Sequence, residues 1–184
     1  DGSGAWIEAP AENVGEAVVA AVTAGGIDHL FFTSGSEIAF IQEAIANDPE
    51  LSVAYFYLGN SYDNLYKPSR KGEAENDAYL TKAIEYYKLA SEKEQDPTLR
   101  KRSFEFLVAA YGPDKMNDPT QQEPIVNKMI QLDPQDVTNY FALAKINEDA
   151  GEYQKAEEVL NKAKEARPND PQVYLQLAGF YNRQ

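Results

Sequence analysis

A spacing of 34 residues constrains the fold of this chain more than any other feature of its sequence. An aromatic residue, a leucine and an alanine in one segment return 34 positions later: Tyr140, Leu143 and Ala144, then Tyr174, Leu177 and Ala178. Positions i, i+3 and i+4 lie on one face of a helix, so each set predicts an amphipathic helix. A repeat of this length holds two helices and a turn, and it buries its apolar face only against neighbouring repeats.

The segment between the two sets has the features of a second helix. Its turn glycine, its spaced small and apolar residues and its closing proline are Gly151, Ala156, Leu160, Ala163 and Pro168. Together with the aromatic opening, this pattern resembles the tetratricopeptide repeat. The resemblance implies a mostly α solenoid of helical hairpins that binds other proteins and rarely performs chemistry. We predict helices over 137–150, 153–166 and 171–183.

The same resemblance extends over about residues 37–184. It predicts hairpins over about 52–97, 99–134 and 137–168, with half-units at 37–49 and 171–184. Two connections are longer than the turn of this family. The segment 66–77 is rich in charge, Gly and Pro, so we expect a long loop that extends the ends of its helices. The segment 112–119 is the other long loop.

The first 36 residues follow a different pattern. Residues 1–4 are typical of a linker or a cloning scar. An amphipathic helix over 15–24, a Gly-Gly end and a compact apolar run over 29–33 are typical of α/β folds. Residues 14–46 resemble the opening of the pyrimidine-binding domain of thiamine-diphosphate enzymes such as acetolactate synthase. The stretches that carry this resemblance are 15–19, 24–32 and 35–37.

The rest of that enzyme family's pattern is missing from the sequence. The family needs a second strand ending in a Glu and a Gly-Asp-Gly motif, whereas this chain leads into the repeats and has no Gly-Asp-Gly. We therefore expect no thiamine diphosphate and no other cofactor. The junction favours a chimera, natural or recombined in a laboratory, and the start of the chain favours the laboratory. We expect the helix–strand segment to dock on the first helices of the array; a homodimer through this segment and an irregular conformation are the alternatives.

Composition excludes several classes of function. A net charge of −13 repels nucleic acid and anionic lipid and steers basic partners toward the chain. The absence of Cys excludes thiolate chemistry. Together with the lack of a signal-peptide pattern, it favours a soluble cytoplasmic protein. His29 is the only histidine, so neither a catalytic triad nor a metal site is expected. Paired carboxylates such as Glu157 and Glu158 are interpreted as solvated helix faces.

The family resemblance implies a concave groove lined by the first helix of each hairpin. By register the candidate groove residues are Phe56, Asn60, Asp63, Glu105, Phe141, Lys145, Glu148 and Leu175. Phe56, Phe141 and Leu175 would anchor a peptide if they are open, and neighbouring helices or the N-terminal segment would cover them otherwise. The expected function is a non-enzymatic scaffold that binds a peptide or protein. The alternatives are a chimeric protein without evolved activity and, last, a thiamine-diphosphate enzyme fragment.

Overall fold

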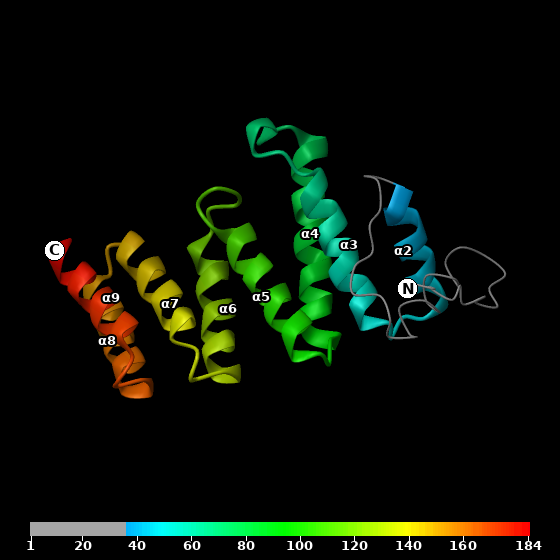
Figure 1. Ribbon diagram of the computed structural model, residues 1–184. Coiled ribbons are helices and arrows are strands. Elements are labelled where there is room, and N and C mark those ends of the chain that lie inside the picture. The colour runs from blue at the N-terminus through cyan, green and yellow to red at the C-terminus, as the bar shows by residue number, and fades with distance from the viewer. Residues whose placement is uncertain (1–35) are drawn as a thin grey trace, which may run out of the picture. The chain divides into compact units, whose positions relative to one another are not determined.

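The computed structural model describes residues 36–184, and its regular elements over that range are all helices (Figure 1). They are α2 (Ser36–Asn47), α3 (Ser52–Leu65), the 3-10 turn η1 (Pro68–Arg70), α4 (Ala74–Lys93), α5 (Pro97–Tyr111), α6 (Pro119–Leu132), α7 (Val137–Asp149), α8 (Tyr153–Ala166) and α9 (Pro171–Asn182). The predicted helix and strand within the first 35 residues, their docking and His29 lie outside the described residues.

The chain divides into two compact units, residues 1–103 and 104–184. The described part of the first unit contains α2, α3, α4 and the first half of α5. The second unit contains the rest of α5 and helices α6 to α9.

The core of the first unit forms where α3 and α4 lie side by side (Figure 1). Leu58 and Tyr87 are fully or almost fully buried there, at 0% and 1% exposure. The two helices approach closely because Gly59 has no side chain: a Cβ at this position would lie 2.8 Å from Cδ1 of Tyr87. The small residues Ala83 and Ala90 of α4 are likewise fully buried.

A buried carboxylate links the end of α4 to the start of α3. Glu94, which follows α4, is 5% exposed, and its Oε1 accepts hydrogen bonds from the amides of Gln95 and Asp96 at 2.8 and 2.9 Å. Its Oε2 accepts a hydrogen bond from the hydroxyl of Ser52 at 3.0 Å. Glu94 therefore satisfies backbone donors after α4 and fastens them to the first residue of α3.

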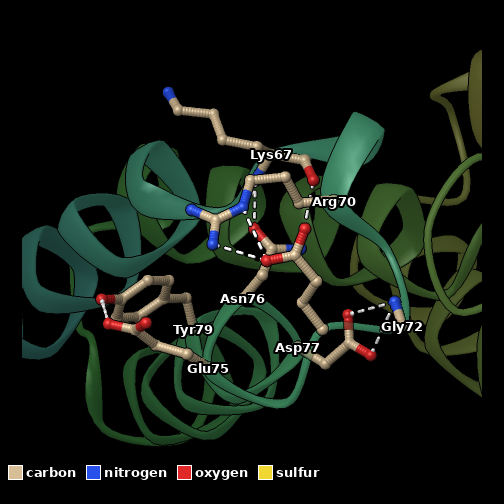
Figure 2. Close-up of polar contacts among 8 residues, drawn as sticks. Lys67, Arg70, Gly72, Glu75, Asn76, Asp77 and Tyr79 are labelled. Carbon is tan, nitrogen blue, oxygen red and sulfur yellow. Dashed lines mark hydrogen bonds and ion pairs between the residues drawn. The ribbon is translucent and has the colours of Figure 1, made fainter.

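The long α3–α4 connection is ordered by its own polar contacts (Figure 2). Asn76 is 1% exposed; its Oδ1 accepts a hydrogen bond from the Lys67 amide at 2.8 Å, and its Nδ2 donates to the Lys67 carbonyl at 3.1 Å. The Asp77 carboxylate accepts from the amide of Gly72, whose φ of +96° suits glycine. These contacts order the loop. The 20-residue α4 begins at Ala74, inside the segment 66–77, so this helix extends into the predicted loop.

Aspartates and prolines define where helices begin in the second unit. The carboxylates of Asp118, Asp136 and Asp170 accept hydrogen bonds from backbone amides in the first turns of α6, α7 and α9. Pro119 and Pro171 occupy the first helical positions of α6 and α9, where no amide is needed. Between α7 and α8 the turn is made at Gly151, with a φ of +76°.

The core of the second unit follows the repeat. Ala156 and Ala163 of α8 are both 0% exposed, as expected for positions where helix backbones approach closely. They pack in one apolar cluster with larger side chains from α6, α7, α8 and α9: Val126, Tyr140, Leu143, Leu160, Val173, Leu177 and Phe180.

Candidate functional site

A two-point ion pair joins α7 to α9 in the second unit. Nε of Arg183 lies 2.6 Å from Oε1 of Glu148, and Nη2 lies 2.9 Å from Oε2. The Glu148 side chain is only 12% exposed, whereas that of Arg183 is 53% exposed. The hydrogen bond from Arg183 holds the pKa of Glu148 below its usual value, and the same contact raises the pKa of Arg183.

Apolar and charged residues occupy further positions of α7 and α9. Phe141, on α7, is half-buried and packs against the core cluster. Leu175 occupies the matching position on α9, 34 residues later, and is 71% exposed. One turn after Phe141, the exposed Lys145 forms an ion pair with Asp149. We refer to Phe141, Lys145, Glu148, Leu175 and Arg183 as the α7–α9 face.

The remaining predicted groove residue of the second unit is Glu105, which is exposed on α5. The other three, Phe56, Asn60 and Asp63, lie on α3 in the first unit, so the two sets are described separately. Asn60 and Asp63 are half-buried.

Phe56 is not a surface anchor. The side chain is 5% exposed, and its ring centroid lies 6.0 Å from that of Tyr87 and 5.6 Å from that of Tyr57. The sequence left open whether Phe56 is exposed or covered, and the position is covered because α4 brings the large ring of Tyr87 against it. This burial matches the alternative interpretation, in which a neighbouring helix covers the position.

The second unit also contains a cleft of about 390 Å³ that the register of the repeat does not predict. Its apolar walls come from α5, the α5–α6 loop and α7: Val108, Tyr111, Pro113, Ala142, Ile146 and Ala150. Pro119 and the polar side chains of Asn117, Gln122, Lys145 and Asp149 complete the lining. We call this feature the loop cleft. Of the predicted groove residues only Lys145 contributes to it, and the sole sequence signal is the length of the loop at 112–119.

The described residues offer no arrangement suited to metal binding: over residues 36–184, no three His, Cys, Asp or Glu side chains group as metal ligands. The carboxylate of Glu157, one of the paired acids, instead accepts a hydrogen bond from the hydroxyl of Tyr181 at 2.5 Å. None of the helices in the described range is both long enough and apolar enough to span a bilayer.

Comparison with known proteins identifies the repeat. Residues 116–178, which hold α6, α7, α8 and most of α9, match the model of the tetratricopeptide repeat family. This segment is similar to the tetratricopeptide repeat (TPR). No curated protein matches the chain. The match includes every residue of the α7–α9 face except Arg183. It also includes the part of the loop cleft that Asn117, Gln122 and α7 contribute.

Solved structures share the fold at low sequence identity. A crystal structure of MamA is 18% identical, with a TM-score of 0.54 over 94% of this chain and 85% of that chain. TTC0263, a thermophilic TPR protein in Thermus thermophilus, is 16% identical with a TM-score of 0.53, over 91% and 79% of the two chains. YrrB, a TPR protein with an unusual peptide-binding site, is 16% identical with a TM-score of 0.52, over 79% and 66%. The predicted fold of TPR-like helical hairpins is thereby confirmed for the described residues.

Proposed function

We propose that this chain is a non-enzymatic protein-interaction scaffold and that the α7–α9 face of its second unit binds a peptide. The observation that carries the proposal is the 71% exposure of Leu175 at the position that Phe141 occupies one repeat earlier. A large apolar side chain that is open to solvent is typical of the anchors of binding surfaces.

The charge pattern of α9 supports this location. The helix Pro171–Asn182 contains no Asp, Glu, Lys or Arg, although charged residues make up 26% of the chain. Removing water from charged groups is costly at an interface, and apolar contacts with Leu175 require little of it. Glu148 of α7 and Arg183, directly after α9, neutralise one another.

The fold and the charge of the whole chain agree with a protein partner. TPR proteins bind peptides and other proteins, and the related fold of YrrB includes a peptide-binding site. A net charge of −13 attracts basic segments at long range, so we expect the bound peptide to carry lysine or arginine. The same charge disfavours nucleic acids and anionic membranes as partners. The resemblance of residues 14–46 to thiamine-diphosphate enzymes stays an interpretation of the sequence.

A display library of random peptides tests the proposal. Peptides selected on the wild-type chain should bind at least about tenfold more weakly to Leu175→Gln, because this change removes an apolar anchor while keeping similar size. Leu132→Gln is the matched control, since Leu132 is 50% exposed in the same unit but lies outside the α7–α9 face. Equal binding of the selected peptides to the wild type and Leu175→Gln would show that this face is not the site.

A further inference from the structure

The loop cleft extends beyond the shared repeat because the α5–α6 connection of this chain, residues 112–118, forms one of its walls. Building on the proposed function, we propose that the loop cleft receives one apolar side chain of the bound peptide, and that the residues flanking this side chain are basic. The proposal rests on the shape of the cleft, on the rigidity of its walls and on the charges around it.

The cleft is held open by hydrogen bonds within its own walls. The amides of Asn117 and Asp118 donate to the carbonyls of Gly112 and Tyr111 at 2.8 and 2.9 Å, which folds the loop back on the end of α5. Nε2 of Gln122, on α6, donates to the Val108 carbonyl at 2.9 Å and fixes α6 against α5. Since the walls are already ordered, a ligand loses little affinity to conformational entropy when it binds.

The lining has the chemistry of a side-chain pocket. Its walls are apolar, and its polar groups include Lys145 and Asp149, which already pair with each other. A volume of about 390 Å³ lies at the lower end of the range for ligand sites, about 300–1,000 Å³. A space of this size suits an individual side chain such as Leu, Met or Phe better than a whole amphipathic helix.

Charge around the opening favours a basic peptide. Asp114 and Asp118 directly follow the lining residues Pro113 and Asn117, and Lys115 is the cation between them. Because Lys145 is neutralised by Asp149, the local balance is acidic, in agreement with the charge of the whole chain. Basic residues on both sides of the inserted side chain would therefore approach faster and bind more tightly than acidic ones.

Fluorescein-labelled dodecapeptides with a central Leu or Phe between lysines provide the test, with binding measured by fluorescence anisotropy. We expect at least tenfold weaker binding when the central residue is Ala or when glutamates replace the lysines. Ala150→Phe fills the cleft from an exposed position, so it should weaken binding at least tenfold without unfolding the chain. Ala109→Phe is the matched control, because Ala109 is an exposed alanine of α5 outside the lining.

Methyl NMR supplies a second measurement that needs no variant. Peptide binding should shift the methyl signals of Ala142 and Ile146 in the cleft, and these shifts should vanish with the Ala-centred peptide. If Leu175→Gln weakens binding but Ala150→Phe does not and both methyl signals stay fixed, the cleft proposal is wrong and the α7–α9 face stands. The reverse result supports the cleft and rejects the face. No binding by any lysine-flanked peptide overturns the cleft proposal, whereas the library selection still tests the face.

Discussion

Arg183, directly after α9, donates to both carboxylate oxygens of Glu148 on α7, at 2.6 and 2.9 Å. The paired geometry makes this contact more specific than a single surface ion pair. It spans 35 positions in sequence and ties the end of α9 to α7.

The Glu148–Arg183 pair should make stability depend on pH in a defined direction. The folded chain lowers the pKa of Glu148, so the stabilisation is present at pH values above the unfolded value of about 4.3 and is lost as pH falls through the folded pKa. Arg183→Gln should therefore reduce the free energy of unfolding at pH 7. Urea unfolding at several pH values should show the difference from the wild type closing below about pH 4. A constant difference across this range would contradict the role of the ion pair.

Replacing Gly59 by Ala should destabilise the first unit. The new Cβ would lie 2.8 Å from the ring of Tyr87, which is itself 1% exposed and has little room to move. Overpacking costs about 1–3 kcal/mol, more than the gain of about 0.5–1 kcal/mol from removing a helical glycine. Gly179→Ala is the control, because its Cβ meets only the flexible end of Arg183, at 3.2 Å. In chemical denaturation, the free energy of unfolding of Gly59→Ala should be lower than that of the wild type. That of Gly179→Ala should equal or exceed the wild-type value.

Ala163→Leu should overpack the contact between α8 and its neighbours. Ala163 is 0% exposed, so three extra carbon atoms have no space and the expected loss is about 1–3 kcal/mol. Ala109→Leu adds the same atoms at an exposed site of the same unit and should have little effect. An Ala163→Leu variant with an unchanged urea midpoint and an unchanged slope would overturn this packing.

Asn76→Ala should loosen the α3–α4 loop. The change removes both hydrogen bonds to the Lys67 backbone at a site with 1% exposure, and buried groups left unsatisfied cost about 1–3 kcal/mol. Hydrogen exchange of the Lys67 amide should become faster because the loop opens locally. Buried amides of α3, such as that of Leu58, should still exchange only through global unfolding. Asn64→Ala, at an exposed position of α3, is the control. If the Lys67 amide exchanges at the same rate in both variants, Asn76 does not hold the loop.

Local signals in the sequence were sufficient to define α7 and α8. The helix predicted over 153–166 is α8 (Tyr153–Ala166), and the one predicted over 137–150 ends one residue earlier, at Asp149. These limits depend on neighbouring residues: Gly151 accepts the positive φ of the turn, and Asp136 supplies the cap of α7. Such effects act over a few positions, so the chain reveals them without its tertiary contacts.

The loop cleft shows what such local signals cannot reveal. Its walls bring Val108 and Pro113 together with Ala150, about forty positions away, and the sequence indicates only that the connecting loop is long. Whether a long loop projects into solvent or folds back to form a wall depends on hydrogen bonds such as that from Asn117 to Gly112.

The exposure of the candidate anchors was decided by the tertiary structure alone. The repeat assigns Phe56, Phe141 and Leu175 to the same register position, and the sequence by itself determined that all three lie on helices at that position. Yet Phe56 is 5% exposed and Leu175 is 71% exposed. Register fixes only the direction of a side chain from its own helix, whereas burial depends on which groups from elsewhere reach that side. The ring of Tyr87 reaches Phe56, and nothing of comparable size covers Leu175 within the described residues.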